Sequence, residues 1–188
     1  MPSKGSNVFA ALRHFNWRQY IVYIAFVGIF IYFAVTLSSD GFLTMNNLLN
    51  IIRQTAIISI MGVAMTFVMS AAEIDLSVGS IAALSSLTTA LALQSGYGIL
   101  GAIVAGLGTG FIIGLINGML VTKVAIPSFL VTLGMMGIAK GLAMWVTQTA
   151  PVPIINETYV YIFGSGNIGS VPVLLLWTLV IVAIGHVM

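Results

Sequence analysis

The chain has 188 residues, of which 60% are hydrophobic and only 5% are charged, and its formal net charge is +2. A soluble globular domain carries about 25% charged residues, so this composition excludes a water-soluble domain and indicates an integral membrane protein. The small net charge gives no reason to expect nucleic acid as a partner. The chain lacks cysteine, which excludes thiolate metal sites, and its two histidines, His14 and His186, have no metal-ligand spacing.

The N-terminal segment 1–19 carries Lys4, Arg13 and Arg18 ahead of a long uncharged apolar run. That run exceeds the roughly 7–15 residues of a signal-peptide core, and no small-residue cleavage site follows it. We therefore expect a retained first membrane span near residues 20–37.

Five further apolar stretches follow the first span, separated by residues typical of turns. At a rise of about 1.5 Å per residue, each nearly crosses a hydrocarbon core about 30 Å thick. The chain is therefore predicted to be a single all-α membrane domain, residues 1–188. Its six transmembrane helices are expected near residues 20–37, 55–72, 76–93, 99–121, 128–146 and 171–188.

The connections between these spans differ in length. A turn is expected at residues 38–41, followed by a short amphipathic helix on the membrane surface at residues 42–54. Residues 94–98 form a short turn. The longest connection, residues 147–170, is polar and contains Gly and Pro, so we expect it to fold on the membrane surface.

Orientation follows from the excess of Lys and Arg in cytoplasmic segments. The basic segment 1–19 places the N-terminus in the cytoplasm. Alternating spans then place Glu73 and Asp75 toward the inside and residues 147–170, which contain no Lys or Arg, outside. Arg53 falls at the outer end of the second span, where its long side chain can snorkel to the interface.

Glu73 and Asp75 are two of the four carboxylates in the chain and stand at the start of the third span. A charge at the bilayer centre costs at least about 2.5–3.5 kcal/mol, so these acids need a structural or functional reason. One interpretation is a helix-start role, since both acids favour the positive end of the helix dipole and Asp75 can cap it. The other is a polar pathway lining or a contact with a neighbouring subunit, to which Ser77 would also belong.

Two more polar residues lie within predicted spans. Lys140 in the fifth span either snorkels to the outer interface or serves the pathway. Its partnership with Glu73 is not expected, because the two fall toward opposite membrane faces. Asn117 in the fourth span bonds either a neighbouring helix or a sugar hydroxyl.

The fourth span carries a glycine at every fourth position, which places these residues on one helix face. Such faces let transmembrane helices approach closely, so we predict helix packing rather than a sliding contact beside a pathway. The glycines are Gly106, Gly110, Gly114 and Gly118.

Several stretches together resemble the ribose-type permease family of bacterial ABC sugar importers. The sequence EIDLSVGS is similar to the family's signature, and four further stretches match in the same order along the chain. The matching stretches are residues 73–80 (EIDLSVGS), 42–51 (FLTMNNLLNI), 114–123 (GLINGMLVTK), 126–134 (IPSFLVTLG) and Lys140-Gly141.

The resemblance implies a multi-pass permease of the bacterial inner membrane with a vitamin-B12-importer-like (type II) fold. Its implied partners are a second permease copy, cytoplasmic ATP-binding subunits, a periplasmic sugar-binding protein and membrane lipid. No cofactor or catalytic residue is expected, because the chain has no Walker A motif and ATP would bind to the partner subunit. Family members are longer, so we expect this chain to be the N-terminal part of a permease.

The predicted function is alternating-access import of a monosaccharide such as ribose or xylose, driven by ATP. Two alternatives remain open. In an ion-coupled secondary transporter, Glu73, Asp75 and Lys140 would be coupling-ion sites. The other alternative is a truncated, inactive permease fragment.

Overall fold

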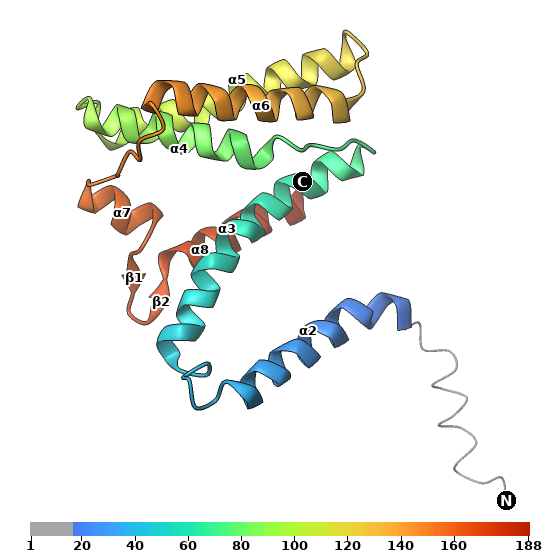
Figure 1. The fold of residues 1–188 in the computed structure, drawn as a ribbon, viewed down its shortest axis with the longest axis vertical. Coiled ribbons are helices and arrows are strands. Elements are labelled where there is room, and N and C mark those ends of the chain that lie inside the picture. The colour runs from blue at the N-terminus through green and yellow to red at the C-terminus, as the bar shows by residue number, and fades with distance from the viewer. Residues whose placement is uncertain (1–16) are drawn as a thin grey trace, which may run out of the picture. The chain divides into compact units, whose positions relative to one another are not determined.

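The computed structural model describes residues 17–188, so most of the predicted cytoplasmic segment, with Lys4 and Arg13, lies outside the described residues. Helices make up most of the described chain, which confirms the all-α prediction (Figure 1). The elements in order are α2 (Trp17–Thr36), α3 (Met45–Ser70), α4 (Val78–Gln94), α5 (Gly98–Thr122), α6 (Ser128–Thr147), α7 (Glu157–Phe163), β1 (Asn167–Ile168), β2 (Val171–Pro172) and α8 (Val173–Val187).

The chain divides into two compact units between Ile51 and Ile52. In the first unit, helix α2 ends at Thr36 and the predicted turn follows, with Gly41 at a φ of 83°. The Phe42 ring then packs back onto α2, with its centroid 5.6 Å from that of Phe30 and 6.0 Å from that of Phe33. These aromatic contacts fix the turn against the helix that precedes it.

In the second unit, helices α4, α5 and α6 lie side by side (Figure 1). Their shared apolar core contains one residue from α4, one from α5 and two from α6, each buried. Thr88 of α4 and Thr109 of α5 add a hydroxyl–hydroxyl hydrogen bond of 2.9 Å between two helices. The core residues are Leu84, Ile113, Met135 and Ala139.

Helix α8 packs along α3 within the second unit. A Cβ built on Gly185 would stand only 2.6 Å from a methyl carbon of Val63, so glycine permits this close approach. The Thr178 hydroxyl also lies 3.4 Å from the carbonyl oxygen of Ala56, while bonding its own helix at Leu174.

The segment after α6 folds into helix α7 and a two-stranded antiparallel hairpin, which the sequence analysis did not predict. The Asn156 side chain caps α7 by accepting a hydrogen bond from the backbone N–H of Tyr159 at 2.9 Å. The segment is tied to α3 by Arg53 Nη2, which donates to Asn167 Oδ1 at 2.9 Å, and to α4 by Gln94, which donates to the Pro153 carbonyl at 3.2 Å.

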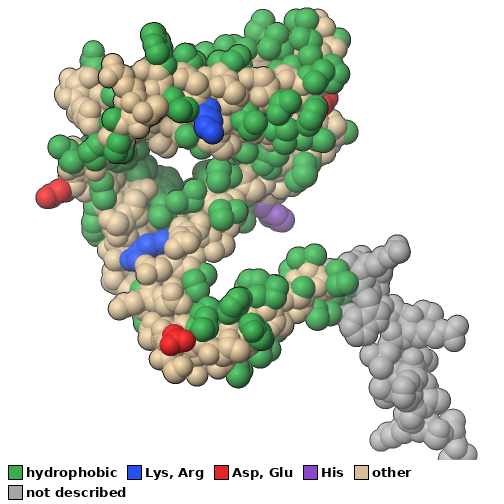
Figure 2. Space-filling view, viewed as in Figure 1, with side chains coloured by type: hydrophobic (Ala, Val, Ile, Leu, Met, Phe, Trp, Pro, Cys, Tyr) green, Lys and Arg blue, Asp and Glu red, His purple; other side chains and the backbone are tan. Residues whose placement is uncertain are grey.

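All six predicted spans coincide with apolar helices. Within the described residues, α3, α5 and α6 are long and apolar enough to cross a membrane, whereas Tyr20–Thr36, Val78–Gln94 and Val173–Val187 are shorter apolar helices. Figure 2 shows hydrophobic side chains spread over the visible helix surfaces, with few charges among them. Such a surface suits contact with lipid, and six crossings stay a prediction.

The expected surface helix at residues 42–54 is not separate from the second span. Helix α3 instead runs without a break from Met45 to Ser70. The reason is that no Gly or Pro stands between Met45 and Met61, so nothing interrupts the backbone hydrogen bonds. The polar residues predicted to lie on the surface form the first turns of this longer helix.

Candidate functional site

The connection between α3 and α4, residues 71–77, contains both acids that the sequence analysis singled out. It begins with a helix-terminating turn: Ala72 takes a φ of 59°, and the Glu73 N–H donates to the Val68 carbonyl at 3.2 Å. Ala72 itself donates to Met69 at 3.0 Å. This is a Schellman motif in which alanine stands where glycine is usual. The chain leaves α3 in a fixed direction as a result.

The first turns of α6 hold the backbone of this connection at Ile74. The Ile74 N–H donates to Ser128 Oγ at 3.2 Å, and Thr132 Oγ1 lies 3.3 Å from the Ile74 carbonyl oxygen. Ser128 and Thr132 are one helical turn apart, so their hydroxyls stand on one face of α6. Ser128 thereby satisfies the Ile74 N–H, whereas Thr132 donates chiefly to the Ser128 carbonyl of its own helix at 2.8 Å and only shares that proton with the Ile74 carbonyl.

Asp75, Ser77 and Asn117 form a connected polar cluster. Asp75 Oδ1 accepts two hydrogen bonds from Ser77, one from its N–H at 2.7 Å and one from its hydroxyl at 2.6 Å. Asn117 Nδ2 of α5 donates to the same hydroxyl oxygen at 3.1 Å. Ser77 is fully buried and Asn117 is 7% exposed. Because hydrogen bonds to a carboxylate are the stronger kind, the cluster fixes the start of α4 against α5.

The directions of these bonds determine how the Asn117 amide is oriented. Ser77 gives its only hydroxyl proton to Asp75 and can accept but not donate toward Asn117. Asn117 must therefore present its amide nitrogen, which leaves Oδ1 buried and without a hydrogen-bond partner among the described residues. An unpaired buried acceptor costs about 1–3 kcal/mol. The cluster thus carries an unused acceptor that a donor from water or another chain would satisfy.

The other two predicted site residues lie apart from this cluster. Glu73 is half-buried in the connection, and Lys140 is exposed on α6, twelve positions after the first residue of that helix. At the start of α4, the N-cap residue is Ser77, and Asp75 bonds Ser77 rather than the first turn of the helix. A helix-start role of Asp75 stays a prediction.

The glycine face of α5 meets α4 over only part of its length. A Cβ on Gly106 would collide with Thr89 Oγ1, and a Cβ on Gly110 would lie 3.5 Å from Ser85 Oγ. Gly114 and Gly118 face open space as far as the described residues extend. Tight packing against α4 therefore depends on Gly106.

A cavity of about 870 Å³ lies between the α4–α5 pair and the α7–α8 pair. One wall carries the hydroxyls of Ser85, Ser86 and Thr89 together with Gly106 and Gly110, and the other carries the rings of Tyr159, Phe163 and Trp177. We name it the hydroxyl–aromatic cavity. The sequence does not predict this cavity, because its residues are far apart along the chain and α7 is too short to be recognised from its pattern.

The three rings form a continuous row. The Tyr159 and Phe163 centroids are 4.9 Å apart, and Phe163 stacks on Trp177 at 5.5 Å. The Trp177 indole N–H donates to the Ile162 carbonyl at 2.9 Å, which fixes the ring. Burial raises the pKa of the Tyr159 hydroxyl, and its hydrogen bond with Thr89 only partly opposes this effect. The phenol is therefore neutral and available as a hydrogen-bonding group at physiological pH.

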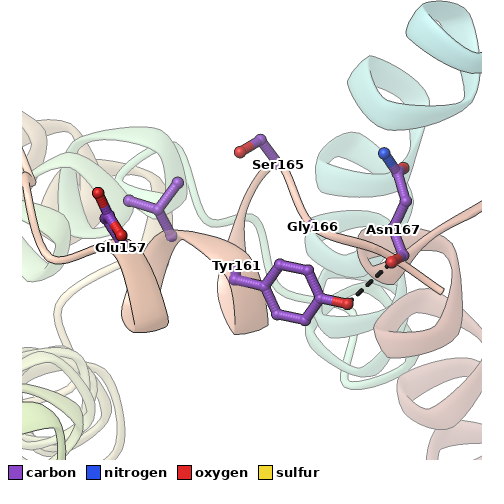
Figure 3. A pocket seen from close by; sticks show the side chains of 6 residues that line it. Glu157, Tyr161, Ser165, Gly166 and Asn167 are labelled. Atoms are coloured by element: carbon purple, nitrogen blue, oxygen red, sulfur yellow. Dashed lines mark hydrogen bonds between the residues drawn. The ribbon is translucent and has the colours of Figure 1, made fainter.

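A second, shallower pocket of about 470 Å³ lies on the segment after α6. Figure 3 shows the Tyr161 ring reaching across it, with its hydroxyl bonded to the backbone carbonyl of Asn167 at 2.9 Å. Glu157 stands at the opposite end of the pocket and Ser165 is exposed. The Tyr161 bond braces the loop, and the pocket has no constellation of catalytic groups.

Comparison with known proteins matches residues 47–188 to the family described as "Branched-chain amino acid transport system / permease component". The chain is 38% identical over 135 residues to the ribose import permease protein RbsC of Escherichia coli (strain K12), covering 72% of this chain and 42% of that protein. No solved structure matches.

Two further relatives resemble the chain to a similar degree. The ribose import permease protein RbsC of Bacillus subtilis (strain 168) is 36% identical over 150 residues, covering 79% of this chain and 47% of that protein. The xylose transport system permease protein XylH of Escherichia coli (strain K12) is 34% identical over 154 residues, covering 81% of this chain and 38% of that protein. The chain thus spans less than half the length of these relatives.

Proposed function

The chain belongs to the permease-component family of branched-chain amino acid transport systems, and from this premise we propose a membrane-spanning permease subunit of an ATP-driven monosaccharide importer. The observation that carries the proposal is identity of 34–38% to ribose and xylose permeases over most of this chain. The apolar helical architecture supports it, since its helices suit membrane spans. Ribose and xylose are the first substrates to test.

The proposed partners follow from this function. Cytoplasmic ATP-binding subunits would supply energy, a periplasmic sugar-binding protein would deliver the substrate, and a second permease copy would complete the pathway between the two subunits. The proposed location is the bacterial inner membrane with its lipid around the helices and the N-terminus in the cytoplasm. The basic residues of segment 1–19 support that orientation.

We assign Asp75, Ser77 and Asn117 a positioning role in this function. Their hydrogen bonds, with those of Ser128 and Thr132 to Ile74, join α4, α5 and α6 into one body at the end that the charge pattern places inside. Alternating access requires helices to move as rigid groups, and such a junction transmits motion without deforming.

Glu73 and Lys140 are proposed to contact the pathway or a neighbouring subunit, because neither is buried in the cluster. The exposed Lys140 is the sharper test of this role. Replacing it with Ala should lower sugar uptake while the amount of protein in the membrane stays at the wild-type level. Wild-type uptake by Lys140→Ala would remove the residue from the pathway and from subunit contacts that matter for transport.

The proposed function is tested in a strain that lacks its own ribose and xylose permeases. Cells expressing the protein with its ATP-binding and sugar-binding partners should accumulate radiolabelled ribose or xylose. Accumulation should stop when the ATP-binding subunit is omitted. Uptake that persists without that subunit and collapses with a proton uncoupler, while cellular ATP is maintained, would instead identify an ion-coupled transporter. Protein that reaches the membrane normally but takes up neither sugar would contradict both transport functions.

A further inference from the structure

The hydroxyl–aromatic cavity combines two walls of different chemistry. The α4–α5 wall presents the hydroxyls of α4 beside Gly106 and Gly110 of α5, and the α7–α8 wall presents the ring row. A volume of about 870 Å³ falls within the range of small-molecule sites, which are mostly apolar with a few placed polar groups. The cavity therefore has both the size and the mixed lining of a small-molecule site.

The hydrogen-bonding capacity of the α4–α5 wall is only partly used. Ser86 and Thr89 donate to carbonyls one turn earlier in their own helix, at 2.8 and 2.9 Å, and keep oxygen lone pairs. Ser85 Oγ has no hydrogen-bond partner among the described residues. A polar ligand in the cavity would thus find one free donor and several acceptors on a single helix face.

The aromatic wall, in contrast, offers mainly apolar ring surfaces. The Trp177 N–H is already bonded to Ile162, so Trp177 and Phe163 offer only ring surfaces to the cavity. Tyr159 adds a neutral hydroxyl beside Thr89. Ring faces suit the C–H surface of a sugar, whereas hydroxyls suit its edge, and the cavity presents these two surfaces on opposing walls.

We propose that the hydroxyl–aromatic cavity is a contact site for the transported monosaccharide. The cavity would lie toward the outer face of the membrane, where the permease first receives the sugar. The inference rests on the proposed function and names residues for it: Ser85, Thr89, Tyr159, Phe163 and Trp177. The charge pattern places α7 and the end of α4 on the outer side, so the cavity lies where an importer takes up its substrate. A lipid tail would leave the Ser85 hydroxyl unpaired, which favours the polyhydroxylated ligand.

The test uses single cysteines, because the 188 residues contain none. Ser85→Cys places a thiol inside the cavity, and Ser165→Cys, on the exposed loop, is the matched control. Membrane vesicles containing the whole protein are treated with a charged, water-soluble methanethiosulfonate in the presence of ribose, xylose or, as a control, betaine at equal osmolarity. Modification is followed by mass spectrometry.

The sugar should slow modification of Ser85→Cys by about tenfold at ten times its half-protecting concentration. Modification of Ser165→Cys should not change. Labelling of Ser85→Cys that ignores the sugars would overturn the proposal. Failure of the charged reagent to reach Ser85→Cys, while it modifies Ser165→Cys, would also overturn it, since lipid or protein would then fill the cavity. ATP-dependent uptake in the same vesicles reports separately on the proposed function.

Two tyrosine variants, one inside and one outside the cavity, test whether the Tyr159 hydroxyl contacts the sugar. In the Ser85→Cys background, Tyr159→Phe should raise the half-protecting sugar concentration by about three- to tenfold, the effect of one lost hydrogen bond. Tyr161→Phe removes a hydroxyl from the same helix outside the cavity and should leave that concentration unchanged. Equal effects of the two variants would mean that the cavity hydroxyl does not contact the sugar.

Discussion

At the scale of single residues, the buried hydroxyl of Ser77 connects two elements that are otherwise separate in sequence. It donates to Asp75 and accepts from Asn117, forty positions later. Each of the three stands out in the sequence as a polar residue beside or within apolar spans, but the sequence did not predict that they form one cluster. Ser128 and Thr132 of α6, which bond the backbone of the neighbouring Ile74, were not identified, because small hydroxyl residues are common in membrane helices and carry no distinctive pattern.

Ser77→Ala should destabilise the protein by about 1–3 kcal/mol. The substitution removes two hydrogen bonds and leaves the Asn117 amide nitrogen and the Asp75 carboxylate without this partner. Chemical and thermal denaturation in detergent would measure the loss. Ser80→Ala, on the same helix, should stay within about 0.5 kcal/mol of the wild type, and equal losses in both variants would refute the special position of Ser77.

Tyr159 should ionise above its ordinary pKa of about 10, because burial disfavours the phenolate. The folded protein then holds this proton more tightly than the unfolded chain does. Tyr159 contributes its full share of stability below pH 10, and that share is lost as the pH rises through the raised pKa. The difference in ultraviolet absorbance between the wild type and Tyr159→Phe during an alkaline titration isolates this group. A midpoint at or below pH 10 would contradict the burial argument.

At the scale of elements, the sequence predicted every long helix but not the short helix α7 and the hairpin between α6 and α8. Apolar runs set the positions of α2 to α6 and α8, and the turns at residues 38–41 and 94–98 were located by their Gly and Ser residues. Helix α7 escaped prediction because its seven residues are too few to show a period. The hydroxyl–aromatic cavity depends on that helix, so it could not be anticipated either.

The glycine face of α5 was predicted as one packing surface, but only its first half contacts α4. Gly106→Ala should therefore destabilise the α4–α5 pair by about 1–3 kcal/mol, because its Cβ would collide with Thr89 Oγ1. Gly118→Ala meets open space among the described residues and should be neutral or slightly stabilising, since Ala is the better helix former. Comparable thermal stability losses for the two variants in detergent would contradict this division.

At the scale of the whole molecule, function depends on the orientation of the chain in the membrane. The distribution of Lys and Arg predicts that the loop at Ser165 lies outside and the loop at Lys123 inside. The hydrogen bond between Arg53 and Asn167 agrees with this arrangement, because it joins the predicted outer end of the second span to the segment predicted to lie outside. The same predicted orientation would place the hydroxyl–aromatic cavity on the outer side, from which the proposed importer would receive its sugar.

Single cysteines can test this orientation, since the 188 residues contain none. In intact spheroplasts, a membrane-impermeant maleimide should label Ser165→Cys, whereas Val124→Cys should be labelled only after the membrane is permeabilised. Both positions are exposed in the structure, so access should depend on the membrane alone. The reverse pattern would invert the topology and move the cavity to the cytoplasmic half.

The most direct measurement of the central claim is sugar uptake into proteoliposomes that contain the protein and its ATP-binding subunits. ATP is supplied on the side of those subunits, and the sugar-binding protein with radiolabelled ribose or xylose on the other. The account predicts accumulation of sugar that requires ATP hydrolysis and is unaffected when the proton gradient is abolished. Accumulation driven by an imposed ion gradient without ATP would contradict it.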